Sequence, residues 1–251
     1  MKKGTHVIIQ ARMGSSRLPG KILAPFIGEF SPLHWIVERA KMSKQVERVI
    51  VATSTNPLDE ATEAACKMIG CDVYRGSEED VLTRFYEAVK LFDTQVIADA
   101  TGDNPFFDLA VMDRMIEMLE GEHYDYLNSH PGGLPTGTGT QVFTRRAFDR
   151  VAAEADTPYD HEHVTPYFYH HPELFKQKNV APAVLHPFAP AARLTLDTSE
   201  DLQLLQTLAK GMGFSKPSEQ PTTNEILTYL QAHPEVASIN KEIVQKTFPK
   251  A

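Results

Sequence analysis

The apolar residues of this chain fall into two kinds of run, which alternate along most of its length. Short runs rich in β-branched and aromatic residues predict strands, and longer segments with apolar residues three and four positions apart predict helices. The expected strands cover residues 7–9, 46–53, 71–74, 96–100, 124–128, 141–143 and 193–196. The expected helices cover residues 32–40, 58–69, 81–89, 108–119, 144–155, 198–208, 224–232 and 241–247.

Residues typical of helix ends support several of these boundaries. Ser31 followed by Pro32 has the form of an N-cap with proline in the first helical position, and Gly70 is placed to end the helix before it. Residues 77–80, Ser-Glu-Glu-Asp, have the form of a capping box. The alternation of strands and helices predicts an α/β fold with a mostly parallel central sheet flanked by helices. Because no repeat or low-complexity linker divides the chain, we expect one domain over residues 1–251.

Composition limits the classes of partner. The net charge of −8 at pH 7 argues against general binding to nucleic acid or to a membrane surface, so any anion site must be local. No apolar run approaches membrane-spanning length, and the first residues lead into a strand rather than into the core of a signal peptide. Cys66 and Cys71 fit no Cys-x-x-Cys pattern and are expected to be buried thiols in a reducing compartment. We therefore expect a cytoplasmic protein.

The loop after the first strand is the strongest candidate for a binding site. Its glycines and serines, such as Gly14 and Ser15, let the backbone turn sharply and approach a ligand. Arg12, Arg17 and Lys21 place three cations in the same short loop. Guanidinium and ammonium groups bind phosphate by forked and point-charge contacts, so this loop is expected to hold phosphate.

The loop is not a P-loop. Walker A has four residues between its first glycine and Gly-Lys, which Ser or Thr then follows. Here five residues separate Gly14 from Gly20, and Ile22 follows Lys21. The dinucleotide pattern Gly-x-Gly-x-x-Gly is absent from the sequence too.

Two aspartates lie at or just beyond the ends of expected strands, Asp103 after residues 96–100 and Asp197 after residues 193–196. In parallel α/β sheets, ligands bind outside the carboxyl ends of the strands. Mg²⁺ prefers oxygen ligands with few protein contacts, so two carboxylates at neighbouring strand ends suit it. Either aspartate could instead cap a helix or close a turn. We expect both to be Mg²⁺ ligands.

Two segments of the second half remain open to interpretation. Residues 131–140 hold four glycines and two prolines, too many for a regular element, and we expect a substrate loop there. Residues 159–171 carry four histidines. Zinc is not favoured for them, because His-Glu-His at 161–163 is not the zincin spacing and no cysteine lies near. A hydrogen-bonded structural role suits these histidines equally well.

Five motifs occur in a fixed order along the chain. They are Ile-Gln-Ala-Arg-Met-Gly-Ser-Ser-Arg-Leu-Pro-Gly-Lys at 9–21, Arg-Gly-Ser-Glu-Glu-Asp-Val-Leu at 75–82, Thr-Gly-Asp-Asn-Pro at 101–105, Glu-His-Val-Thr-Pro at 162–166 and Leu-Thr-Leu-Asp-Thr at 194–198. In these motifs the chain resembles the SpsF-like cytidylyltransferases, which are named after a spore-coat polysaccharide protein and related to the CMP-sialic acid and CMP-Kdo synthetases. The resemblance implies a Rossmann-like nucleotidyltransferase fold. It also implies Mg²⁺-dependent transfer of CMP from CTP to an acidic sugar, with release of pyrophosphate, in surface polysaccharide biosynthesis.

The resemblance further implies which residues act. The expected nucleotide-binding residues are Ala11, Arg12, Gly14, Ser15, Arg17, Lys21, Arg75, Asp80 and Thr101, of which residues 75–80 lie near the base and ribose. Arg12, Lys21 and Asp103 are expected to be catalytic. Glu162 and His163 are expected to touch the acceptor or a partner subunit, within a segment for substrate and homodimer contacts at residues 131–190.

The chain departs from the family pattern in its substrate half. Family members usually carry Glu where this chain has Gln141, Asp where it has Gly139, and Arg where it has His161. Losing two carboxylates and a guanidinium changes what the acceptor pocket can pair with. We expect Gln141 to contact an acceptor that is unusual for the family.

Two other functions compete with this expectation. A glycosyltransferase uses similar sheets and a metal, but such enzymes normally carry Asp-x-Asp, and Asp99 and Asp103 are four residues apart. A non-catalytic nucleotide-binding relative is suggested by Gln141 and Gly139. Turnover of a ready-made nucleotide sugar would indicate the first, and CTP binding without turnover the second.

Overall fold

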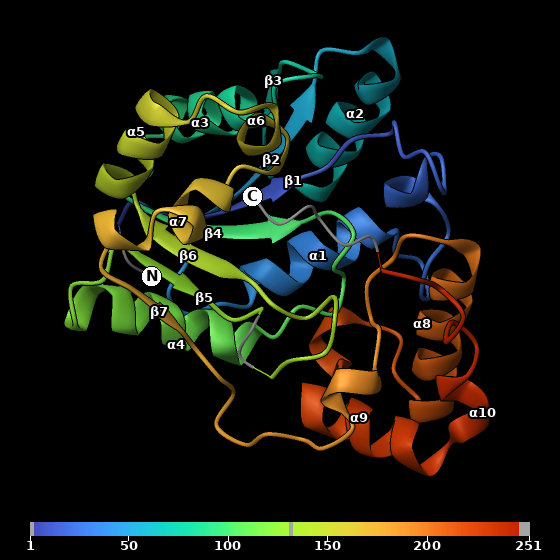
Figure 1. The fold of residues 1–251 in the computed structure, drawn as a ribbon. Coiled ribbons are helices and arrows are strands. Elements are labelled where there is room, and N and C mark those ends of the chain that lie inside the picture. The colour runs from blue at the N-terminus through green and yellow to red at the C-terminus, as the bar shows by residue number, and fades with distance from the viewer. Residues whose placement is uncertain (1–2, 131–132, 246–251) are drawn as a thin grey trace.

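The computed structural model describes residues 3–130 and 133–245 (Figure 1). The strands are β1 Thr5–Gln10, β2 Arg48–Ser54, β3 Asp72–Gly76, β4 Val96–Thr101, β5 Tyr126–Asn128, β6 Gln141–Thr144 and β7 Gln177–Asn179. The helices are α1 Pro32–Lys41, α2 Glu60–Ile69, α3 Val81–Leu91, α4 Leu109–Gly121, α5 Arg145–Glu154, α6 Pro158–His163, α7 Pro166–His170, α8 Ser199–Met212, α9 Thr223–Ala232 and α10 Pro234–Ala237.

The strands form one mixed sheet in the order β3-β2-β1-β4-β6-β5-β7. β1, β2, β3 and β4 are parallel, and β6 runs antiparallel to both β4 and β5. In the register of the central pair, Gln10 lies opposite Thr101, so β1 and β4 end side by side. The loops that follow these two strands therefore start from the same edge of the sheet, where parallel α/β sheets bind ligands.

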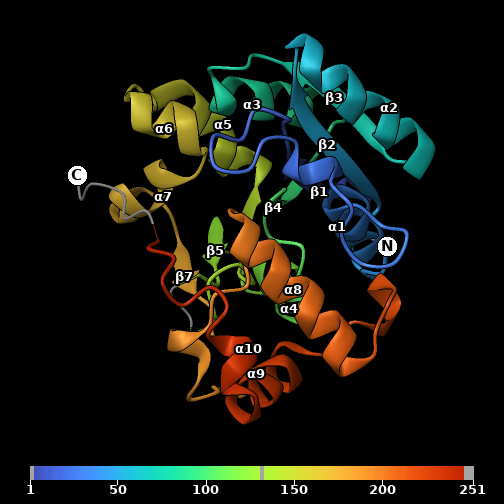
Figure 2. The ribbon, with the colours of Figure 1, turned by 90° about the vertical axis from the view of Figure 1, so that its right-hand side faces the viewer.

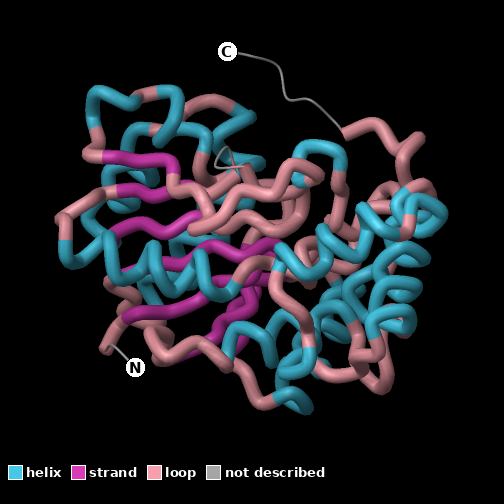
Figure 3. The backbone as a smooth tube through the Cα atoms, turned by 90° about the horizontal axis from the view of Figure 1, so that it is seen from below, coloured by secondary structure: helices cyan, strands magenta, loops and turns pink. Residues whose placement is uncertain are grey.

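Helices cover both faces of the sheet, and a third group of helices packs beside it (Figures 1 and 3). One face packs against α1, α2 and α4, and the other against α3, α5 and α7. The third group, α8, α9 and α10, builds an apolar cluster around Trp35 and Phe106. The predicted α/β class and mostly parallel sheet are therefore confirmed, with one antiparallel strand inside the sheet.

The expected strand at residues 193–196 is wrong. Leu194 and Leu196 are fully buried, but they pack into the third apolar cluster rather than the sheet. The only pairing described for this segment is an isolated bridge between Arg193 and Thr136. Asp197 therefore follows an extended segment, and it does not lie at the end of a sheet strand.

Two smaller expectations are corrected, and further elements are found that the sequence did not predict. The edge strand β7 was not expected, because Gln177–Asn179 is polar throughout. Asp80 is the N-cap of α3 and Ser77 Oγ accepts the Asp80 N–H, so the reciprocal capping box expected there is not formed. The histidine segment forms two short helices, α6 and α7. Residues 241–245 of the last expected helix are turn and coil, and its remainder lies outside the described residues.

Two further features are the lengths of the helices and the state of the cysteines. Among the described residues, no helix combines the length and apolar character needed to cross a bilayer. Both cysteines are free thiols, with Cys66 buried as expected and Cys71 half-buried.

Candidate active site

A cleft of about 710 Å³ opens at the edge of the sheet where β1 and β4 end. Its walls come from the loop after β1, the first turn of α3, the loop after β4, the loop between β5 and β6, the end of α6 and the segment before α8. Figure 2 looks toward this edge of the sheet, with α3 and α6 above it and α8, α9 and α10 below it. Segments far apart in the sequence therefore contribute to one site.

The basic loop after β1 is held in place by a hydrogen bond to a buried aspartate and by a hydrogen bond within the loop. Asp59, which is 2% exposed, accepts the Met13 N–H at 2.7 Å. The Met13 carbonyl in turn accepts the N–H of Gly20 at 3.1 Å, and Gly20 has a φ of 72°, which favours glycine. This turn carries the chain directly into Lys21, so the position of the lysine is determined by backbone contacts.

Lys21 is the centre of the charge cluster. Its ammonium group donates to the carbonyl of Leu196 at 2.7 Å and to Asp197 Oδ1 at 3.0 Å, and Asp103 Oδ2 lies 3.7 Å away. Arg17 reaches the same Oδ1 of Asp197 at 2.8 Å. Two carboxylates thus converge on one buried ammonium group at the floor of the cleft.

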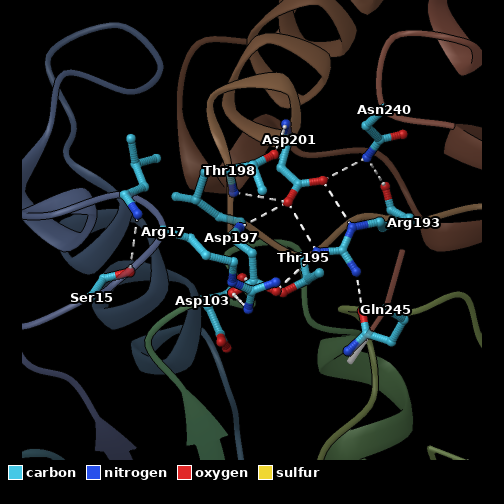
Figure 4. Close-up of polar contacts among 12 residues, drawn as sticks. Ser15, Arg17, Asp103, Arg193, Thr195, Asp197, Thr198, Asp201, Asn240 and Gln245 are labelled. Carbon is cyan, nitrogen blue, oxygen red and sulfur yellow. Dashed lines mark hydrogen bonds and ion pairs between the residues drawn. The ribbon is translucent and has the colours of Figure 1, made fainter. Parts of the chain in front are cut away.

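Asp197 is oriented from behind by a second network, drawn in Figure 4. Arg193 donates to Asp197 Oδ2 at 2.9 Å and binds both oxygens of Asp201 at 3.0 Å. Asp201 is fully buried and accepts the N–H groups of Asp197 and Thr198 as well as an amide hydrogen of Asn240. Arg193 therefore occupies one oxygen of Asp197 and leaves the other turned toward Lys21.

The charges around Asp197 determine its ionisation. Burial opposes the charged form, but Lys21, Arg17 and Arg193 outweigh burial and lower the pKa of Asp197. Asp197 is therefore a carboxylate over the whole physiological range, which a metal ligand must be.

The carboxylate pair fits one Mg²⁺ ion. Asp103 and Asp197 both approach the position of the Lys21 ammonium, so their oxygens are close enough to share a cation. In the part of the chain that the structure describes, no group of three or more His, Cys, Asp or Glu side chains is arranged to hold a metal. Mg²⁺ is characteristically held by one or two carboxylates, with substrate phosphates and waters completing its shell. Asp103 and Asp197 would be those two carboxylates.

Comparison with known proteins shows which family has this fold. A family model described as cytidylyltransferase matches residues 6–228. The chain is 37% identical to the spore coat polysaccharide biosynthesis protein SpsF of Bacillus subtilis, over 92% of this chain and 95% of that protein. The chain belongs to the cytidylyltransferase family.

Solved structures agree with this assignment. A cytidylyltransferase from Leptospira borgpetersenii superposes with a TM-score of 0.86 at 28% identity, covering 98% of this chain and 99% of that chain. A CMP:2-keto-3-deoxy-manno-octonic acid synthetase, solved in complex with CTP, has a TM-score of 0.60 at 17% identity over 82% of this chain and 98% of that chain, and shares the fold. The expected Rossmann-like nucleotidyltransferase fold is confirmed, and the chain is a nucleotidyltransferase.

Most residues expected to act in this cytidylyltransferase line the cleft. From the β1 loop these are Ala11, Arg12, Gly14, Ser15, Arg17 and Lys21, and from elsewhere Thr101, Asp103, Glu162, His163 and Asp197. Val164, directly after the last two residues of α6, is fully buried with a φ of 68°. A β-branched residue rarely adopts this conformation, and such strain clusters at functional sites.

Three expected residues lie outside the cleft lining. Arg75 pairs with Glu63 at 3.1 Å and donates to two backbone carbonyls. Asp80 caps α3, and its Oδ1 lies 2.9 Å from Nδ1 of His161. Gln141 accepts the hydroxyl of Tyr126 through its side-chain oxygen. In this conformation each of the three has a structural partner of its own.

Several residues of the cleft were not expected from the sequence. Arg84 and His130 line it, and Arg193 stands behind Asp197. Burial lowers the pKa of His130, although the charge of Asp103 opposes this. A Cβ on Gly139 would lie 2.8 Å from the His130 ring, so this glycine makes room for the imidazole. That contact links one of the departures from the family pattern to the cleft wall.

Proposed function

We propose that the cleft transfers CMP from CTP to an acidic acceptor, with Mg²⁺ as cofactor and pyrophosphate as the second product. The observation that carries the proposal is the position of Lys21 between Asp103 and Asp197, with Arg17 beside it. A cation cluster facing a carboxylate pair suits a nucleoside triphosphate that binds together with a divalent metal.

The chemistry is a substitution at phosphorus. An acceptor oxygen forms a bond to the α-phosphorus while the bond from that phosphorus to the pyrophosphate oxygen breaks. Arg12, Arg17 and Lys21 bind phosphate oxygens and neutralise charge that would repel an anionic acceptor. Because Arg17 and Lys21 contact Asp197 in the structure, nucleotide binding exchanges this carboxylate for phosphate partners. The metal, when bound by Asp103 and Asp197, would stabilise negative charge on the phosphate oxygens.

The acidic acceptor follows from the relatives rather than from the cleft. The synthetase that shares the fold is named for an octonic acid, and SpsF for spore coat polysaccharide biosynthesis. In our proposal Glu162 and His163 contact the acceptor from the α6 wall. Gln141 as an acceptor residue, and Arg75 and Asp80 as nucleotide residues, stay predictions, because each requires a side-chain movement from the contacts described above.

We further propose how the chain is organised. Residues 1–251 form one domain, in which Lys21 of the N-terminal loop bonds to the Leu196 carbonyl of the C-terminal part. The segment 131–190 forms acceptor and homodimer contacts. Residues 131 and 132 of this segment lie outside the described residues. The cytoplasm, where thiols such as Cys66 stay reduced, is the proposed location.

A pyrophosphate-release screen tests the proposal. The protein is incubated with Mg²⁺, each of the four nucleoside triphosphates and a panel of sugar acids, phosphosugars and phosphonates. The proposal predicts release with CTP and at least one acid. No release with any pair, together with turnover of a ready-made nucleotide sugar, would indicate a glycosyltransferase instead. CTP binding without any turnover would indicate a non-catalytic relative.

Asp99 argues against the glycosyltransferase. Such enzymes normally take both metal carboxylates from one Asp-x-Asp motif, and Asp99, four residues before Asp103, is the aspartate of β4. Asp99 is 4% exposed and accepts the Gln10 amide at 2.9 Å. Burial raises the pKa of Asp99 to about 7, which is unsuited to a cation ligand.

A further inference from the structure

A second cavity, with a cysteine in its wall, lies away from the active-site cleft. It has a volume of about 380 Å³ and opens at the edge of the sheet where β2 and β3 begin, between Lys41, Arg48, Cys71 and Asp72. These two strands are parallel, so this edge lies opposite the carboxyl ends of the strands, where the cleft opens. Among the described residues, none that lines this cavity also lines the cleft. The cavity is therefore a separate feature of the molecule.

The turn between α2 and β3 brings Cys71 close to the second cysteine, Cys66. Gly70 ends α2 with a φ of 71°, and the N–H groups of Gly70 and Cys71 both donate to the Cys66 carbonyl, at 2.9 and 3.1 Å. At helix ends of this kind the side chains of the two flanking residues commonly contact each other. The bond from the Cys71 N–H keeps the two Cα atoms no more than about 7 Å apart, and disulfides usually span about 4.4 to 6.8 Å. The backbone thus places the two cysteines within reach of a disulfide.

The two thiols differ in access. Cys66 is fully buried in the apolar cluster on the face of the sheet that α1 and α2 cover. Cys71 is half-buried at the margin of the same cluster and lines the cavity, and its Sγ lies 3.7 Å from the Cys66 carbonyl oxygen. A small dissolved oxidant can therefore reach Cys71 from solvent, whereas Cys66 is shielded behind it.

The two thiols also differ in ionisation. A hydrogen bond with the Cys66 thiol and the positive charge of Lys41 lower the pKa of Cys71, although burial and the charges of Asp72 and Glu38 oppose this. The same hydrogen bond and burial raise the pKa of Cys66. The thiolate is the form of cysteine that reacts with oxidants. Cys71 is thus the thiol that reacts first, and Cys66 stays protonated beside it.

We propose that Cys66 and Cys71 form a reversible disulfide when the protein meets hydrogen peroxide. The Cys71 thiolate attacks one peroxide oxygen, and the O–O bond breaks to give a sulfenic acid and hydroxide, which takes the proton that Cys71 released. The Cys66 sulfur then attacks the Cys71 sulfur, the S–O bond breaks, and the departing hydroxide leaves as water with the Cys66 proton. Two thiols are oxidised to one disulfide, and one peroxide is reduced to two waters. A thiol reductant reverses the reaction by exchange.

The disulfide would protect the fold around α2. A sulfenic acid without a neighbouring thiol is oxidised further to the sulfinic acid, which thiol reductants do not reverse. At Cys71 this would place a negative charge against the apolar cluster that α2 helps to form. Asp59, at the first end of α2, holds the basic loop through Met13, so damage to this helix would also reach the cleft. In a reducing compartment the disulfide is transient, which suits a protective role.

Thiol counting and disulfide mapping test the inference. The full chain is treated with hydrogen peroxide, and free thiols are then titrated in denaturant. The wild type should lose both thiols together, peptide mapping should join Cys66 to Cys71, and dithiothreitol should restore both thiols. Cys66→Ala removes the second thiol, so its Cys71 should instead be labelled by dimedone, which reacts with sulfenic acids. In Cys71→Ser the buried Cys66 should react about tenfold more slowly or less than the wild-type pair.

Three results would overturn the inference. They are the loss of only one thiol per wild-type chain, a disulfide that joins two chains, and oxidation of Cys66 in Cys71→Ser at the wild-type rate. The mapping of the wild-type bond needs no variant, so the test stays decisive even if a cysteine variant does not fold. None of these measurements depends on CTP or on an acceptor, so their outcome is independent of the proposed transfer reaction.

Discussion

At the residue scale, the site depends on how three cations share one carboxylate. One carboxylate oxygen of Asp197 contacts both Lys21 and Arg17, and the other oxygen contacts Arg193. The two loop cations belong to the ligand side of the cleft, whereas Arg193 belongs to a buried network with Asp201. We infer that nucleotide binding draws Lys21 and Arg17 toward phosphate and that Arg193 keeps Asp197 in position meanwhile.

Removing the Lys21 ammonium should be costly for turnover. Lys21→Ala loses a charge-assisted contact to phosphate, and pyrophosphate release from CTP should fall about 100-fold or more. The circular dichroism spectrum should stay unchanged, because Arg17 and Arg193 still neutralise Asp197. Lys67→Ala, a change to a lysine with a 69% exposed side chain, is the control and should keep full activity. Wild-type activity in Lys21→Ala would remove the loop from the mechanism.

Asp103 is expected to contribute to the metal site. Asp103→Asn keeps the shape of the side chain but removes its charge, so the Mg²⁺ concentration for half-maximal activity should rise about tenfold or more, or activity should vanish. Asp93→Asn is a suitable control, since Asp93 is exposed at the opposite end of β4, and its φ of 49° is tolerated by asparagine. An Mg²⁺ titration of Asp103→Asn that overlays the wild-type curve would contradict the assignment.

Asp99 makes stability depend on pH. Burial raises its pKa to about 7, above the usual value near 4, so between these values the folded state keeps a proton that the unfolded chain has released. The free energy of unfolding should therefore fall as pH rises through this window. Relative to wild type, Asp99→Asn should gain about 2 kcal/mol between pH 5 and pH 8 in denaturant titrations. Parallel pH curves for the two proteins would show that Asp99 ionises normally.

At the scale of elements, two loops and one extended segment align the acids. The loop between β5 and β6 contacts the segment before α8, where the Leu194 N–H donates to the Thr136 carbonyl at 2.7 Å. Gly137, with a φ of 94°, lies so close that a Cβ would be 2.1 Å from the Thr195 nitrogen. The Thr195 hydroxyl and the Leu196 N–H both donate to the Asp103 carbonyl, so this contact also connects the two acids.

Gly137→Ala should disturb this alignment. Both the positive φ and the close contact oppose a side chain, and the loss should be about 2 kcal/mol or more in stability, together with weaker Mg²⁺-dependent activity. Gly121→Ala at the end of α4 meets no atom within 4 Å and should be neutral or slightly stabilising. Equal melting temperatures for Gly137→Ala and wild type would show that the close contact is not needed.

The sequence predicted a strand correctly where an alternating apolar pattern is buried by neighbouring strands and helices of the sheet. It failed where the pattern is buried by other elements, or where a strand has no apolar pattern. Residues 193–196 alternate like a strand because Leu194 and Leu196 are buried, yet their burial comes from helices α8 and α9 rather than from sheet neighbours. β7 is polar and pairs only with β5 at the sheet edge, so alternation could not reveal it.

The site residues that the sequence revealed, and those that it missed, can be explained in the same way. The basic loop was visible because its three cations stand close together, and the two acids because each follows an expected strand, although the strand expected before Asp197 is absent from the sheet. Arg84 was missed because an arginine on an amphipathic helix normally faces solvent, and only the fold shows it buried in the cleft. Arg193 was missed because its partners, Asp201 and Asn240, come together only through α8 and the last turns of the chain.

At the scale of the whole molecule, the C-terminal helices complete the site. Trp35 lies on α1, which follows the basic loop, and its ring packs edge-on against the ring of Phe26. The ring centroids of Trp35 and Phe214, a residue just after α8, are 5.9 Å apart. The indole N–H of Trp35 donates to Gln220 at 2.8 Å. The loop that is proposed to bind phosphate therefore rests on the same apolar cluster as the segment carrying Asp197.

The proposed homodimer gives a prediction at this scale. Light scattering after size exclusion should give twice the mass of one chain. Tyr169 on α7, 43% exposed within the segment 131–190, is a candidate contact, and Tyr169→Glu should shift the population toward single chains. Met68→Glu, on the 83% exposed Met68 of α2 outside the segment, is the control. A single-chain mass for the wild type at all concentrations tested would contradict the dimer.

The central claim is that the Lys21, Asp103 and Asp197 cluster binds CTP with a divalent metal. The most direct measurement is a crystal structure grown with CTP and Mn²⁺, in which the metal is located by its anomalous signal. We predict one metal between the carboxylates of Asp103 and Asp197, with the triphosphate contacting Arg12, Arg17 and Lys21. A nucleotide bound elsewhere, or a metal that contacts neither aspartate, would contradict the account.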